Sequence, residues 1–77
     1  MSEKLVAIIE EQLNVEAGKI TLESRFKEDL NADSLDLFEL VMALEEAYET
    51  EIPSEKLESM STVGDVVEYM RSNGIEV

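Results

Sequence analysis

The longest helical pattern in the sequence begins near Asp33 and continues to about Tyr48. At 100° per residue, its apolar side chains fall into two stripes. The wider stripe suits a core-facing surface and comprises Leu37, Leu40, Val41, Leu44 and Tyr48. The second stripe lies among Glu39, Glu45, Glu46 and Glu49 and comprises Leu35, Phe38 and Met42. A helix with one buried face does not need this second stripe, so we interpret it as a docking face with an apolar centre and a charged rim. Phe38 lies at the border and fits the core equally well.

The start of this helix is marked by two aspartates. Asp33 is a favourable N-cap residue, and Asp36 occupies the N3 position of a capping-box variant. Ser34 lies between them, and we expect its hydroxyl to be exposed in the first turn. A serine between two carboxylates at a helix N-terminus is an unusual electrostatic setting. We therefore treat Asp33-Ser34-Leu35-Asp36 as the candidate functional site.

The N-terminal part predicts one helix followed by a long connection. A helix over residues 2–13 begins at the N-cap Ser2 and stops at Asn14, which tolerates the left-handed conformation. Residues 14–33 show no helical period, and a connection of this length is uncommon. Apolar residues nevertheless recur along it, at Val15, Ile20, Leu22, Phe26 and Leu30. We expect an ordered loop that crosses one end of a helical bundle.

Two further helices follow the long one. Pro53 disfavours helix at the preceding residue, and Ser54 then caps a short helix over residues 55–59. Thr62 and Asp65 form a second capping box, which opens a last helix that ends at Asn73-Gly74. The inward candidates of these helices are Leu57, Met60, Val63, Val66, Val67 and Met70. The predicted fold is all-α, a bundle of three main helices and one short helix in a single domain over residues 1–77.

The sequence contains no cysteine and no histidine. A chain of 77 residues without disulfides must be stabilised by its apolar core alone. The absence of histidine removes the usual general base for a serine nucleophile and the commonest metal ligand. We therefore expect no enzyme activity in this chain, and we expect any chemistry at Ser34 to be performed by another protein.

Negative charge is concentrated around the candidate site. The formal net charge is −13, and residues 28–60 carry eleven acidic side chains and one basic side chain, Lys56. Such a field disfavours nucleic acid and anionic membranes and attracts basic protein surfaces. Its self-repulsion favours a monomer. No signal peptide or membrane-spanning run is found in the sequence, so we expect a mature, cytoplasmic protein.

Three interpretations of Ser34 compete. The first makes it an ordinary first-turn serine without function. The second makes the acidic stretch a calcium loop, but Ser34 occupies the position that requires glycine, and Leu40 the position that requires glutamate, so no specific metal site is predicted. The third makes Ser34 an attachment point, because a helix N-terminus favours an attached phosphodiester. Asp33 and Asp36 oppose this anion, so we expect them to serve in recognition by a basic modifying enzyme.

The sequence around Ser34 resembles the attachment motif of acyl carrier proteins. Asp33-Ser34-Leu35 matches the motif itself, and the similarity extends over essentially the whole chain. It is closest to the free-standing bacterial carriers of type II fatty acid synthesis. The other matching segments are Phe26, Glu28-Asp29-Leu30, Asp36, Glu39 to Glu46, Glu51-Ile52-Pro53 and Thr62-Val63.

This resemblance implies a specific function. Ser34 would carry 4′-phosphopantetheine, transferred from coenzyme A by a phosphopantetheinyl transferase, and acyl chains would be bound to this arm as thioesters and sheltered between the helices. The long helix would be the surface that fatty acid synthase enzymes recognise through basic docking surfaces. The positions carried over to this role are Leu35, Glu39, Met42, Glu45 and Glu46, to which the exposed-stripe argument adds Phe38.

Three positions depart from the usual pattern of the family. Asn31 stands where glycine is frequent, which a left-handed backbone would tolerate, and Phe38 is bulkier than the residue typical of its position. Lys56-Leu57 interrupts an acidic run. A carrier for polyketide, aminoacyl or D-alanyl groups, or an acidic helical interaction module without an arm, are the alternative interpretations.

Overall fold

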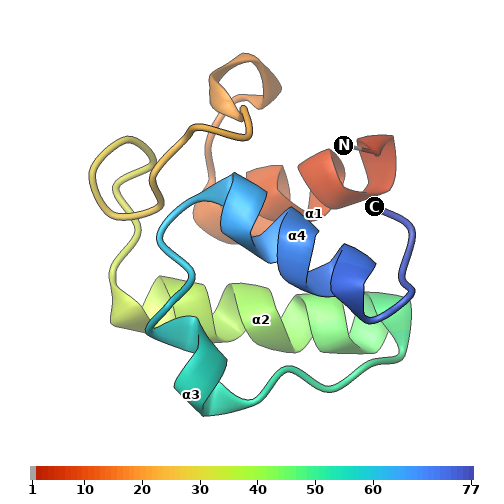
Figure 1. Cartoon of the computed structure of the whole chain (residues 1–77). Helices are drawn as coiled ribbons and strands as arrows, with labels where there is room; N and C mark the ends of the chain where they lie inside the picture. Colours follow the sequence, from red (N-terminus) through yellow and green to blue (C-terminus); the bar gives the residue numbers. More distant parts are fainter. Residues whose placement is uncertain (1) are drawn as a thin grey trace.

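The computed structural model describes residues 2–77 and contains only helices and loops as named elements in that range (Figure 1). The predicted all-α architecture of three main helices and one short helix is confirmed. Residues 2–77 also include a 3₁₀ turn, η1, which was not predicted from the sequence. The elements are α1 (Glu3–Leu13), η1 (Ala17–Lys19), α2 (Ser34–Tyr48), α3 (Ser54–Leu57) and α4 (Val63–Ser72).

The ends of α1 and α4 follow the predicted capping chemistry. The backbone N–H of Leu5 donates to Ser2 Oγ at 3.3 Å, and Asn14 ends α1 in the left-handed conformation with φ 55°. At the start of α4, Thr62 Oγ1 accepts from the N–H of Asp65 at 3.1 Å, and the Asp65 carboxylate accepts from the N–H of Thr62 in return. These local contacts fix the two helices that flank α2.

The boundaries of α3 differ from the prediction. The helix covers Ser54–Leu57 instead of residues 55–59, and Pro53 occupies the N-cap position without a side-chain hydrogen bond. The expectation that Ser54 is the N-cap is therefore wrong. The ψ of Pro53 is 141°, which is extended and not helical, so the helix begins at the next residue. The inward positions of Met60, which is buried, and Leu57, which is partly buried, are confirmed.

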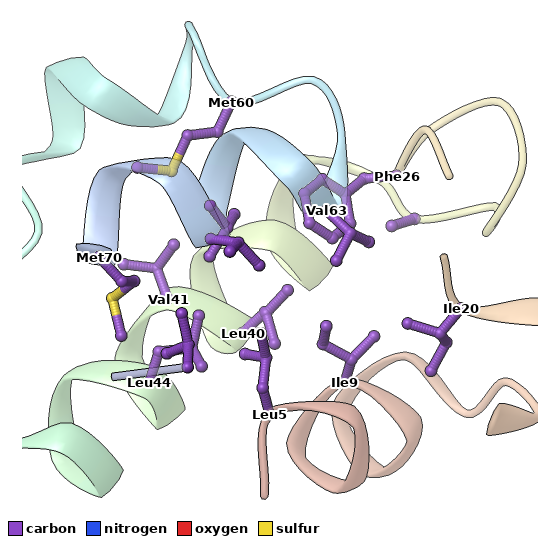
Figure 2. Close-up of a cluster of buried hydrophobic side chains, with 14 of the residues drawn as sticks. Leu5, Ile9, Ile20, Phe26, Leu40, Val41, Leu44, Met60, Val63 and Met70 are labelled. Carbon is purple, nitrogen blue, oxygen red and sulfur yellow. The ribbon is translucent and has the colours of Figure 1, made fainter. Parts of the chain in front are cut away.

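The core lies between α1, α2 and α4 (Figure 2). The predicted core stripe of α2 is confirmed, since Leu40, Val41 and Leu44 are buried and Leu37 and Tyr48 pack against them. α1 contributes the buried Leu5 and Ile9 to the same cluster. α4 contributes its predicted inward residues Val63, Val66, Val67 and Met70, which are all buried. Full burial of one such side chain stabilises the fold by about 1.5–3 kcal/mol, so this single cluster carries most of the stability of a chain without disulfides.

Residues 14–33 form an ordered loop that passes one end of the bundle (Figure 1), as predicted. Ile20, Phe26 and Leu30 anchor it in the core. Backbone hydrogen bonds then join it to the segment that enters α4: Phe26 N–H donates to Ser61 O at 3.0 Å, Val63 N–H to Ser24 O at 3.0 Å, and Gly64 N–H to Leu22 O at 2.9 Å. A Cβ atom at Gly64 would lie 2.8 Å from Leu22 O, so this close approach requires glycine.

The two ends of the described chain lie side by side near the C-terminal end of α2 (Figure 1). Ser2 N–H donates to Val77 O at 3.1 Å. Lys4 adds a contact at the same end, where its Nζ lies 4.6 Å from the centre of the Tyr48 ring and donates to Ala47 O at 3.1 Å. Since the last turn of α2 has no basic residue of its own, Lys4 supplies the cation that a helix C-terminus favours. None of the helices in residues 2–77 combines the length and apolar character needed to cross a bilayer.

Candidate functional site

The candidate site is built on the capped N-terminus of α2. Asp33 has an extended backbone, and its Oδ1 accepts from the N–H of Asp36 at 2.9 Å. In return, Asp36 Oδ2 accepts from the N–H of Asp33 at 3.1 Å. The predicted capping box is therefore confirmed, and both carboxylates contribute one oxygen to it. Ser34 is the first residue of the helix and is exposed, so its hydroxyl is accessible to another protein.

The loop before Asp33 fixes where this helix begins. Arg25 O accepts from the N–H of Asp29 at 2.8 Å and from that of Leu30 at 3.1 Å, and the N–H of Ala32 donates to Phe26 O at 2.8 Å. Leu30 and Ala32 are buried. Between them Asn31 adopts the left-handed conformation, with φ 59°, which asparagine tolerates in a place where glycine is frequent in the family.

An ion-paired cluster, which the sequence analysis missed, stabilises this loop. Arg25 pairs with Glu28 and Asp29, and the Arg25 N–H donates to Asp29 Oδ2 at 2.8 Å. The backbone hydrogen bond from Arg25, followed by its side-chain hydrogen bond, lowers the pKa of Asp29 from the ordinary 3.8. The hydrogen bond and charge of Asp29, with a smaller effect of Glu28, raise the pKa of Arg25. Spacings of three and four residues are the signal that could have indicated these pairs.

A cavity of about 150 Å³ lies between residues 25–28 of the long loop, the first turn of α2, and residues 57–61 at the end of α3 and after it. Its apolar lining comes from Phe26, Leu37, Leu57 and Met60. Charged side chains, among them Arg25, Lys27, Glu28 and Glu58, complete its lining. The cavity is therefore mixed in character, with charged residues beside an apolar part, and its volume is enough for a small apolar group. A short apolar chain attached near the start of α2 therefore has a place to bind.

The second stripe of α2 is exposed, as predicted. Leu35 is 63%, Phe38 50% and Met42 53% exposed, so the ambiguity of Phe38 is resolved in favour of the surface. Glu39 and Glu46 are also exposed and lie on the same helix. α2 contains no lysine or arginine, so all of its charged side chains are acidic.

Glu45 does not share the environment of the other predicted rim residues. It is half-buried, and its Oε2 accepts a hydrogen bond from the backbone N–H of Ile52 at 2.8 Å. This contact spans the turn after α2, and no sequence pattern indicated it. Nowhere in residues 2–77 do three or more carboxylates gather in an arrangement that could hold a metal ion.

Comparison with known proteins places the chain in a family. Residues 3–70 match the family model described as the phosphopantetheine attachment site. The chain is 55% identical over 71 residues to an acyl carrier protein of Helicobacter acinonychis, an alignment that covers 92% of this chain and 91% of the relative. The chain belongs to the acyl carrier protein family. An acyl carrier protein of Helicobacter hepaticus is 56% identical over 71 residues, with 92% of this chain and 93% of that one covered.

Solved structures of acyl carrier proteins share the fold. A chain described as an acyl carrier protein from Mycobacterium tuberculosis superposes with a TM-score of 0.83 at 33% identity, covering 91% of this chain and 93% of that one. The acyl carrier protein of Enterococcus faecalis gives a TM-score of 0.76 at 41% identity, with 92% and 90% covered. The family, fold class and phosphopantetheine cofactor inferred from the sequence are thus confirmed.

Proposed function

We propose that this chain carries acyl groups as thioesters on a 4′-phosphopantetheine arm attached to Ser34, in fatty acid biosynthesis. The observation that carries the proposal is the exposed Ser34 at the capped start of α2, in a chain of this family. Leu37, in the first turn of the same helix, lines the partly apolar cavity. When attached, the arm supplies the terminal thiol that this cysteine-free chain lacks.

Attachment at Ser34 places a phosphodiester between two opposing effects, the favourable dipole of α2 and the negative charges of Asp33 and Asp36. The serine oxygen bonds to the pyrophosphate phosphorus of coenzyme A that bears the pantetheine, the bond from this phosphorus to the bridging pyrophosphate oxygen breaks, and adenosine 3′,5′-bisphosphate leaves. The transferase takes the hydroxyl proton, because this chain contains no histidine to do so. The N-terminal dipole of α2 stabilises the phosphodiester by about 0.3–1 kcal/mol. Asp33, Leu35 and Asp36 frame the serine, and the aspartate oxygens outside the capping box are available to a basic phosphopantetheinyl transferase.

The cavity gives the acyl chain a sheltered position. Phe26, Leu37, Leu57 and Met60 present apolar atoms to it, and each methylene transferred from water to such surroundings contributes about 0.8 kcal/mol. Sheltering also keeps water away from the chain until a partner enzyme binds.

Fatty acid synthase enzymes with basic docking surfaces are the proposed partners of α2. The apolar centre of this docking face is Leu35, Phe38 and Met42, and its acidic rim is Glu39 and Glu46, with Glu45 at the edge. We expect Glu39→Lys and Glu46→Lys each to weaken partner binding by about 1–3 kcal/mol without loss of helix content. Glu68→Lys, an exposed charge reversal on α4, is the matched control. Equal effects of all three reversals would show that the docking face is misplaced.

The remaining expectations belong to the same proposal. The chain is a single carrier domain over residues 1–77, a non-enzymatic, monomeric, cytoplasmic protein that avoids nucleic acid and membranes because of its charge of −13.

Mass spectrometry after incubation with coenzyme A and a phosphopantetheinyl transferase tests the attachment. We expect one phosphopantetheine on the wild type and on the control variant Ser59→Ala, and none on Ser34→Ala. An unmodified wild type, or a modified Ser34→Ala, would favour the acidic interaction module. The acyl group found on protein isolated from its source distinguishes fatty acid synthesis from polyketide, aminoacyl or D-alanyl transfer.

A further inference from the structure

Glu45 organises the turn that follows α2. Its carboxylate accepts from the N–H of Ile52, and its backbone carbonyl accepts from the N–H of Glu49 and, at 3.1 Å, from that of Thr50. Glu49 reverses the chain in the left-handed conformation, with φ 50°. Three amides of the turn therefore converge on one residue, and the carboxylate bond reaches furthest along the chain.

This turn leads directly to one wall of the cavity. α3 has only four residues, which is too short to be stable as an isolated helix. Its position depends on the segments at its two ends. After α3, Met60 is buried and Ser61 O accepts from Phe26 N–H at 3.0 Å. Before α3, Ile52 is buried at 5% exposure, and its amide is held by Glu45.

A second contact before α3 is weaker. The hydroxyl of Tyr69 donates to Glu51 O at 3.5 Å, at the limit of a hydrogen bond, and is exposed. The bond between Glu45 and Ile52 is 2.8 Å long, partly buried and charge-assisted, which makes it the stronger of the two. Loss of the Glu45 carboxylate would leave the amide of a buried residue without this acceptor.

We propose that Glu45 is a positioning residue that holds the α3 wall of the cavity in place through the amide of Ile52, and that its main contribution is this bond and not a charge presented to partners. The role in sheltering an acyl chain rests on the function proposed above. The geometry predicts that Leu57, on the cavity side of α3, is displaced more often when the acceptor at residue 45 is removed.

Amide hydrogen exchange of the unmodified protein tests the bond without any attached arm. In Glu45→Ala we expect the Ile52 amide and the α3 amides to exchange roughly 10- to 100-fold faster, which corresponds to the loss of one charge-assisted hydrogen bond. Glu45→Gln keeps an oxygen acceptor without the charge, so we expect it to retain most of the protection. Glu46→Ala, the exposed neighbour, should leave these amides unchanged. Should Glu45→Ala not fold, Glu45→Asp, with its shorter side chain, replaces it and should show the same acceleration.

A thioester-hydrolysis assay tests the consequence for cargo. Protein loaded from hexanoyl coenzyme A should release hexanoate several-fold faster in Glu45→Ala than in the wild type, with Glu45→Gln close to the wild type. Failure to load any variant counts against the attachment at Ser34, while the exchange experiment still decides the role of Glu45. Unchanged Ile52 exchange in Glu45→Ala, or equal acceleration in Glu45→Gln and Glu46→Ala, overturns the proposal.

Discussion

The capping box formed by Asp33 and Asp36 around Ser34 allows a test that separates two roles of Asp33, stabilisation of α2 and recognition of its charge by a modifying enzyme. In Asp33→Ala, the acceptor for the N–H of Asp36 is lost, while the N–H of Asp33 keeps its own acceptor on Asp36. Loss of such a cap costs about 1 kcal/mol, within a range of roughly 0.5–2 kcal/mol. For a domain of this size, about 1 kcal/mol corresponds to a change in melting temperature of roughly 4–8 °C.

The substitution also removes one negative charge from a chain of net charge −13, which by itself relieves repulsion. Asp33→Asn removes the same charge but keeps a capping oxygen, so the difference between the two variants isolates the hydrogen bond. We expect Asp33→Ala to melt about 5 °C below Asp33→Asn in thermal denaturation followed by circular dichroism. Melting temperatures that agree within measurement error would refute the assigned capping energy.

The same pair of variants then tests recognition. If the transferase reads the charge of Asp33, Asp33→Asn should be modified more slowly at Ser34 although its helix is intact. Modification of Asp33→Asn at the wild-type rate would show that Asp33 acts only through the cap.

Three further outcomes are expected. Met70→Ala should lower the free energy of unfolding by about 2–5 kcal/mol in urea titrations, because Met70 is fully buried. Met42 is 53% exposed, so Met42→Ala should stay within about 0.5 kcal/mol of the wild type. Similar losses in the two variants would contradict the assigned core. The pKa of Asp29 is lowered in the folded protein, so the stabilising contribution of this carboxylate is complete above the ordinary 3.8 and is lost as the pH falls through the lowered value. The difference in unfolding free energy between the wild type and Asp29→Asn should therefore shrink in acid. A difference that stays constant with pH would argue against the pairing of Asp29 with Arg25. Salt or Mg²⁺ should raise the melting temperature by screening the charge of −13, and a melting temperature independent of ionic strength would show that repulsion is not significant.

Local contacts account for most of what the sequence predicted correctly. The capping boxes at Asp33 and Thr62 join residues three apart, and the core stripe of α2 follows from helical periodicity alone. The candidate site lies within four consecutive residues, so it could be located without any knowledge of the tertiary structure. The wrong start of α3 reflects how little sequence a four-residue helix offers for choosing between Pro53 and Ser54 as its boundary.

Apart from the local ion pairs of Arg25, the main features missed in the sequence depend on tertiary packing. Periodicity left Phe38 at a border, and only the packed bundle assigns it to the surface. Lys4 contacts Ala47 across a separation of 43 residues, and nothing in either segment indicates the other. The contact of Glu45 with Ile52 crosses a turn whose course is set by the left-handed Glu49. Acidic residues with similar sequence contexts thus acquire different roles only when the chain has folded.

The adjacent ends of the described chain have a practical consequence. Ser2 and Val77 lie with Tyr48 at one end of α2, and Ser34 begins the other end of this 15-residue helix, about 22 Å away along its axis. A tag, a linker or a solid support joined at Ser2 or Val77 would therefore leave Ser34 and the stripe of Leu35, Phe38 and Met42 accessible. Both ends of the described chain lie on the side away from Ser34, so immobilised protein should present this serine to enzymes in solution.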